Sequence, residues 1–224
     1  MNFKRLNYTF ALLIVIGMVS CSDNDTVSPG KNASLTLKAS SNQLKVSHEL
    51  MITEALIQVE SAEFESLEQG DDDDFEIDFK GPFEINLLTG SSTPEIPTAY
   101  LVPGKYEEVE LELNQNQNPN LIITGTVALA GAAPIEFEFY GYEDLEFESE
   151  GENTELGYLF EVKAGDKVDI VMTFDVESWF ANVDILSGEQ KDGVIEISKT
   201  SNLALYAQII QNIDEEKLIV STGN

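Results

Sequence analysis

Carboxylates are by far the most numerous side chains in this sequence that could do chemistry. The 224 residues include 41 Asp and Glu, against 12 Lys and Arg, one His and one Cys. Two acidic clusters supply the oxygen ligands that Ca²⁺ prefers, although neither has the spacing of an EF-hand loop. A solvated charged surface explains the same clusters without any metal. The candidate calcium ligands are Asp71, Asp72, Asp73, Asp74, Asp78, Asp144 and Glu146.

The sequence lacks the residues that the common types of catalytic site need. His48 is the only histidine, and no Gly-x-Ser-x-Gly sequence provides a nucleophile elbow for a hydrolase. One His and one Cys also cannot build a zinc site. A glycosidase needs only two carboxylates, but the acids here alternate with apolar residues, as on the wet face of a sheet. We therefore expect a protein that is not an enzyme and has no resident cofactor, Ca²⁺ being the one ion to test.

Three aromatic residues could form a stacking platform for a sugar ring. Trp179 is the only tryptophan, and Tyr140 and Tyr142 are separated by a single glycine. Aromatic rings bury large apolar areas, so a tryptophan such as Trp179 more often fills the core or an edge of the domain. Both interpretations stay open at this point.

The first twenty residues have the composition of a secretory signal peptide. Lys4 and Arg5 precede an apolar run over residues 10–19, which is too short to cross about 30 Å of hydrocarbon. Cys21 follows this run and is the only cysteine, so it has no disulfide partner in the chain. The sequence Met18-Val19-Ser20-Cys21 resembles the lipobox of bacterial lipoproteins, which implies that Cys21 carries acyl chains such as palmitate.

The segment after the cysteine is polar. Its acidic start at residues 22–25 resembles the surface-export signal of Bacteroidota lipoproteins, and residues 21–32 are predicted to form the lipidated cysteine and a disordered tether. The net charge of −29 excludes a nucleic-acid partner, because phosphate binding needs clustered cations. We expect a lipid-anchored protein of the cell outer membrane, exposed at the surface, with a glycan or a surface protein as its partner.

From residue 33 onward, the dominant pattern is a period of two, which predicts half-buried strands. Examples are the alternating apolar residues of 75–79, 109–113, 135–139 and 168–174, and further strands are expected at 34–38, 54–67, 83–88, 120–129, 144–148, 158–162 and 194–197. One apolar and one polar face on each strand indicates antiparallel pairing. Residues 33–224 are therefore predicted to form a single all-β domain, an antiparallel two-sheet β-sandwich of the transthyretin or immunoglobulin type.

One segment near the end breaks this alternation. After Thr200-Ser201, a suitable N-cap, apolar residues recur every three or four positions from Leu203 to Ile213. The spacing predicts a short C-terminal helix that covers one end of the sandwich, or else a helix that binds a partner.

Several stretches, taken in order, resemble the domain-of-unknown-function 4382 family of exported bacterial lipoproteins. The matching pieces are residues 52–61, Ile85-Asn86-Leu87-Leu88, Leu101-Val102-Pro103-Gly104-Lys105-Tyr106, and Gly165-Asp166 followed by 168–175. The resemblance covers residues 33–185 and implies a sandwich similar to transthyretin-like domains. It implies no reaction.

We therefore expect a non-enzymatic outer-membrane lipoprotein that serves as a surface binding or structural module. One alternative is a carbohydrate-binding accessory lipoprotein of a glycan-uptake system. A fimbrial or adhesin-type subunit is another, although pilins of the lipoprotein type mature by cleavage after an arginine, and Arg5 is the only arginine in the chain.

Overall fold

The computed structural model describes residues 30–40, 50–67, 77–114 and 118–223, and for residues 77 and 78 it describes the backbone only. Residues from Lys31 onward form one compact unit. In this described part of the chain, no helix is long and apolar enough to cross a membrane.

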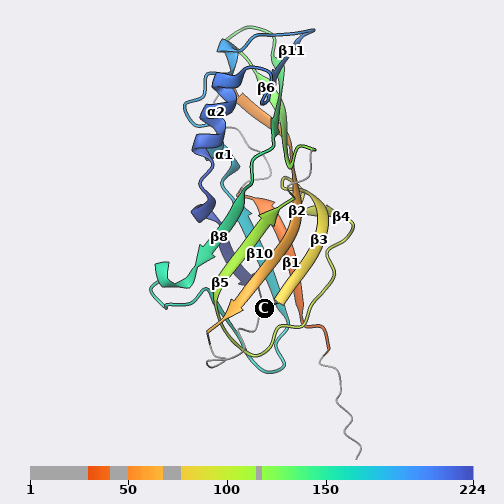
Figure 1. Cartoon of the computed structure of the whole chain (residues 1–224), viewed down its shortest axis with the longest axis vertical. Helices are drawn as coiled ribbons and strands as arrows, with labels where there is room; N and C mark the ends of the chain where they lie inside the picture. Colours follow the sequence, from red (N-terminus) through yellow and green to blue (C-terminus); the bar gives the residue numbers. More distant parts are fainter. Residues whose placement is uncertain (1–29, 41–49, 68–76, 115–117, 224) are drawn as a thin grey trace, which may run out of the picture. The chain divides into compact units, whose positions relative to one another are not determined.

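The smaller sheet, sheet A, has three strands in the order β1–β10–β12 (Figure 1). They are β1 (Ala33–Ala39), β10 (Val168–Phe174) and β12 (Ile219–Gly223). β10 runs parallel to β1 and antiparallel to β12. Ile170 and Met172 are buried, whereas Asp169 is exposed, because a strand turns successive side chains to opposite faces.

The larger sheet, sheet B, is organised around one strand of 17 residues, β2 (Leu50–Ser66). One edge of β2 pairs with β3, while its other edge pairs first with β6 and then with β5. The remaining strands add to these neighbours. The other strands of sheet B are β3 (Ile77–Asn86), β4 (Ser91–Thr93), β5 (Gly104–Leu113), β6 (Leu121–Val127), β7 (Ile135–Gly141), β8 (Glu146–Glu150), β9 (Phe160–Val162) and β11 (Val194–Ile197).

Sheet B packs against sheet A near β8 and against helices near β7. The rings of Phe147 on β8 and Phe174 on β10 meet edge to face, with their centroids 5.1 Å apart. At the other end, Phe139 on β7 stacks on Tyr206, with 5.6 Å between centroids. The helical elements are α1 (Val176–Trp179), α2 (Leu203–Asn212) and the short 3-10 turns η1 (Gly151–Asn153), η2 (Ile185–Ser187) and η3 (Glu215–Lys217). One continuous apolar core joins both regions.

The prediction of an all-β, two-sheet sandwich with a short C-terminal helix is confirmed. The pairing is antiparallel except in two places, where β1 runs parallel to β10 and β11 runs parallel to β7. Both parallel pairs join strands that are far apart in the sequence, and parallel neighbours require such long crossover connections. The prediction of antiparallel pairing throughout is wrong for these two pairs, because β1 and β11 alternate buried and more exposed side chains just as an antiparallel strand does.

Two elements differ in detail from the sequence prediction. The strands expected on either side of Gly81-Pro82 form the single strand β3, whose register against β2 shifts between Val59 and Ser61. The C-terminal helix begins at Leu203, after Asn202 rather than after Thr200-Ser201. Leu203 itself is 61% exposed, and Leu205 takes the buried position instead.

Candidate functional site

Rows of carboxylates cross the outward face of sheet B. On β5, Glu108, Glu110 and Glu112 alternate with buried apolar residues, so these three acids share the solvent-facing side. The register of β8 sets one acid opposite each of them, and β2 adds two more on the other side of β5. We call this set the carboxylate face. It comprises Glu63, Glu65, Glu108, Glu110, Glu112, Glu146, Glu148 and Glu150.

This crowding changes the acidity of the carboxylate face. Partial burial raises the pKa of Glu108 to about 7, and repulsion from Glu148 and Glu65 adds to the effect. Burial also raises the pKa of Glu110, together with the neighbouring charge of Glu146. The pKa of Glu148 rises through burial and its interaction with Glu150. Like charges set side by side disfavour ionisation, so part of the carboxylate face takes up protons near neutral pH.

A small cavity borders the carboxylate face. It measures about 180 Å³ and is lined by Glu148, Glu150, Asn153 and, from η3, Glu216. Close by, the backbone N–H of Glu146 donates to Glu215 Oε2 at 3.2 Å. Even so, no group of three or more Asp, Glu, His or Cys side chains is arranged to hold a metal ion in the described residues.

The predicted calcium ligands are therefore spread over different parts of the chain. Residues 71–74, and also His48 and Cys21, lie outside the described residues. Asp78 pairs with Glu63 in the register of β3 and β2. Asp144 is exposed in the connection before β8, and Glu146 on β8 lies opposite Glu112. Calcium binding stays a prediction.

The aromatic residues expected to stack on a sugar do not form one platform. Trp179 is only 3% exposed, and its ring packs 6.1 Å from Phe147 and 6.4 Å from Phe174. Trp179 therefore fills the core between the sheets, which was the alternative interpretation of this residue. Tyr140 on β7 and Tyr142 directly after this strand are half-buried and make no ring contact with Trp179 among those of the described residues. The Tyr140 hydroxyl donates to Glu138 at 2.7 Å.

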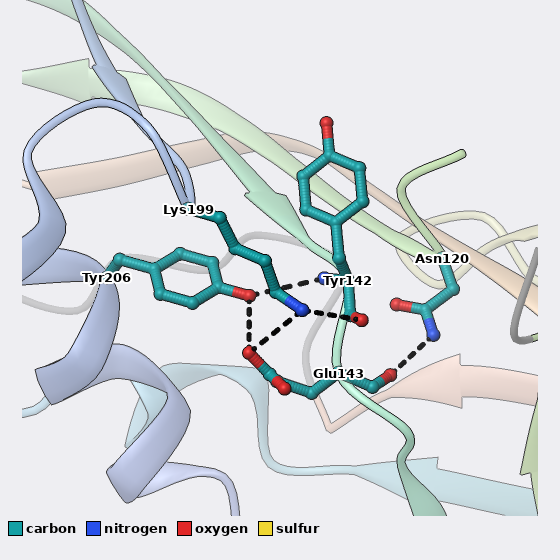
Figure 2. A network of polar contacts seen from close by, with 5 residues as sticks. All are labelled: Asn120, Tyr142, Glu143, Lys199 and Tyr206. Atoms are coloured by element: carbon teal, nitrogen blue, oxygen red, sulfur yellow. Dashed lines mark hydrogen bonds and ion pairs between the residues drawn. The ribbon is translucent and has the colours of Figure 1, made fainter. Parts of the chain in front are cut away.

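A polar network that the sequence did not reveal joins the end of β7 to α2 (Figure 2). The Tyr206 hydroxyl donates to Glu143 Oε1 at 2.9 Å and accepts from the Tyr142 N–H at 3.4 Å. Lys199 Nζ lies 3.4 Å from the same Glu143 oxygen and donates to the Tyr142 carbonyl at 3.1 Å. Burial and the bond to Glu143 raise the pKa of Tyr206. We call these residues, with Asn120, the α2 clamp.

Asn120, directly before β6, completes the α2 clamp. Its amide Nδ2 donates to the Glu143 carbonyl at 2.7 Å, and Figure 2 shows the amide directed toward the Tyr142–Glu143 backbone. Asn120 is 2% exposed, and within the described residues its Oδ1 is a buried side-chain atom without a hydrogen-bond partner. Leaving a buried acceptor unpaired costs about 1–3 kcal/mol. The sequence did not reveal the α2 clamp because its residues are far apart in the chain. Their residue types also make polar contacts in many proteins, so they gave no specific signal.

A second cavity lies beside α1 and η2. Its volume is about 620 Å³, and its lining includes apolar Leu50, Val127 and Val183 together with Asp175, Ser178 and Asp184. A concave surface that combines apolar area with a few polar groups is typical of small-molecule sites.

Comparison with known protein families shows the family to which the chain belongs. The family model described as "Domain of unknown function (DUF4382)" matches residues 26–195, which is more than half of the chain. The chain belongs to the DUF4382 family. The family match confirms the resemblance seen in the sequence and extends it at both ends. No curated protein and no solved structure matches the chain.

The DUF4382 match covers only some of the residues of the α2 clamp. Asn120, Tyr142 and Glu143 belong to the matched residues 26–195, whereas Lys199 and Tyr206 lie beyond them. The elements α2 and β12 also lie beyond the match. We call residues 196–224 the C-terminal extension of this DUF4382 protein. The hydrogen bonds and the ion pair of the α2 clamp connect this extension to the residues that the family model matches.

Proposed function

We propose that this DUF4382 protein is a non-enzymatic lipoprotein, anchored in the bacterial outer membrane and serving as a surface binding or structural module. The observation that carries the proposal is Cys21. It is the only cysteine of the chain, and it follows Lys4, Arg5 and a short apolar run at residues 10–19. A lone exported thiol in that position is suited to acylation.

The charge of the domain is consistent with tethering by lipid rather than by the protein surface. The chain has a formal net charge of −29, and the carboxylate face concentrates part of it on sheet B. Anionic headgroups repel such a surface within a Debye length. The acyl chains on Cys21 therefore hold the protein at the membrane in this proposal.

The anchor is tested by feeding cells a labelled fatty acid and comparing the wild type with Cys21→Ser. We expect label in the wild type and none in Cys21→Ser, while the matched control Ser22→Ala keeps its label. Protease treatment of intact cells then reports surface exposure. Label that persists in Cys21→Ser, or a wild type without label, would contradict the anchor assignment.

A second candidate function is binding of a hydroxylated small ligand such as a sugar, favoured by the 620 Å³ cavity beside α1 and η2. Asp175, Ser178 and Asp184 offer hydrogen-bonding groups next to apolar Val183, a combination that suits a ring with polar edges and an apolar face. Calorimetric titration of a glycan panel tests this. Binding that is lost in Asp184→Asn but kept in Glu95→Gln, an exposed acid outside the cavity lining, supports the site. The absence of binding to every glycan removes this candidate.

A further inference from the structure

The cavity beside α1 and η2 includes four buried apolar side chains in its lining. Leu50 and Val127 are opposite each other in the register of β2 and β6. Phe180 and Ile185 are each 1% exposed, and the ring of Phe180 packs against that of Phe137, with 5.7 Å between centroids. We call Leu50, Val127, Phe180 and Ile185 the apolar floor. Because all four belong to the hydrophobic core, this part of the cavity is formed before any ligand binds.

The charged side chains in the lining of the same cavity are all acidic. They are Asp175, Glu177 and Asp184, and none of the described residues that line the cavity is Lys, Arg or His. Glu177 is half-buried, whereas Asp175 and Asp184 are exposed. These three acids therefore lie closer to solvent than the apolar floor does, and we call them the acidic rim.

The acidic rim has no cation of its own in the part of the chain that the structure describes, where the lysines pair with other acids. Lys217 acts electrostatically on Asp175, but its Nζ lies 2.7 Å from Asp214 Oδ2. The Asp184 carboxylate does not cap η2, and the Ser187 hydroxyl instead donates to the Asp184 carbonyl at 2.7 Å. The charge of Asp184 is thus left for a bound molecule.

The combination of apolar floor and acidic rim distinguishes between classes of small ligand. Three like charges repel a phosphate or a carboxylate. A neutral sugar gains hydrogen bonds but no net charge attraction. An ammonium group gains both, since it donates hydrogen bonds to carboxylate oxygens and these charge-assisted bonds are the stronger ones. The apolar floor suits the ring or chain that carries the ammonium.

We propose that this cavity binds a small ligand with a protonated amine, the ammonium lying at the acidic rim and an apolar ring or chain over the apolar floor. The inference rests on the second candidate function, binding of a small ligand in this cavity, and changes the class of ligand from hydroxylated to amine-bearing. An amino sugar belongs to both classes. The acidic rim and the apolar floor lie within the DUF4382 match, and the inference does not depend on the lipid anchor.

Matched pairs of ligands test the role of the amine. Glucosamine and benzylamine are each compared with their N-acetyl derivative, which keeps the ring but cannot be protonated, in calorimetric titrations of the full chain at pH 6. We expect each amine to bind about fivefold more tightly than its N-acetyl derivative, the size of one exposed ion pair. The preference should shrink at 1 M salt, where the Debye length falls to about 3 Å.

Variants of the acidic rim locate the ammonium. Asp184→Asn and Glu177→Gln should each reduce the amine preference by about threefold, whereas Glu95→Gln, which removes the same charge outside the cavity, should leave it unchanged. Equal binding of amines and N-acetyl derivatives would overturn the inference but keep the cavity as a ligand site. A preference that survives in the Asp184→Asn and Glu177→Gln double variant would also overturn it. Binding of neither class would remove both the inference and the second candidate function.

Discussion

Glu110 on β5 lies directly opposite Glu148 on β8, so two carboxylates share one cross-strand position. Glu63 on β2 occupies the same row on the other side of Glu110. Sheets usually set opposite charges or apolar residues in such positions, because like charges directly across a ladder are destabilising. The carboxylate face therefore opposes folding electrostatically, while the apolar residues on the inner side of the same strands favour it.

The pH dependence of stability follows from the raised pKa of Glu108. Its pKa is about 7 in the folded protein, against an ordinary value of 4.5. Between these values the folded state binds more protons than the unfolded state, so stability is greatest at low pH and is lost as the pH rises through 7. We expect Tm to fall from pH 5 to pH 8 at constant ionic strength, measured by circular dichroism. A Tm that rises over this range would contradict the assignment.

Removing one charge from the crowded row should stabilise the protein. We expect Glu110→Gln to raise the free energy of unfolding at pH 8 by about 0.2–1 kcal/mol, the size of a cross-strand pair effect. Urea denaturation measures the gain, which should shrink at pH 5 and in high salt because protonation and screening weaken the repulsion. Glu95→Gln changes the net charge equally at an exposed loop position and should have no comparable effect.

The α2 clamp should have a measurable stability of its own. Tyr206→Phe removes the hydroxyl that binds Glu143 but keeps the ring stacked on Phe139. The expected loss is about 1–2 kcal/mol, typical of a partly exposed hydrogen bond to a charged group. Tyr142→Phe is the matched control, since only the backbone and ring of Tyr142 take part in the clamp. Equal losses in both variants would mean that the Tyr206–Glu143 bond contributes nothing.

Trp179 should behave as a core residue. Trp179→Ala empties the space beside Phe147 and Phe174 and is expected to cost about 3–5 kcal/mol in urea denaturation. Trp179→Phe keeps an aromatic ring in this position and should cost less. If Trp179→Ala left stability unchanged, the ring would not be a core ring. Loss of glycan binding in Trp179→Ala is therefore a poor test of stacking, because unfolding alone would cause it.

The period of two in the sequence predicted the strands because a strand that buries only one face alternates apolar and polar residues. The same alternation predicted that Glu108, Glu110 and Glu112 lie on one face of a strand. It could not predict that Glu148 lies opposite Glu110, since register depends on pairing between distant segments. The α2 clamp was hidden for the same reason, because Glu143 and Tyr206 are brought together only by tertiary packing.

Short elements carried too little pattern to be recognised. β12 has no buried alternation, so nothing in its five residues distinguishes it from a loop. α1 has four residues and contributes Trp179 to the core. The residue type alone could not show whether this ring is buried in the core or exposed as a stacking platform. Asn202 starts α2 in a left-handed conformation with φ of 49°, a role that Asn tolerates better than most residues but that its sequence context did not signal.

The parallel pair of β1 and β10 has a consequence for the order of events during synthesis. Ala33 pairs with Val168, and Ala39 pairs with Phe174, so β1 is made early but has no partner in sheet A until β10 has been made. Contacts of such long range slow folding. The apolar side of β1 therefore has no cover from β10 through most of translation. A chain that stops before β10 would keep Leu35 and Leu37 exposed and would be a target for chaperones and proteases.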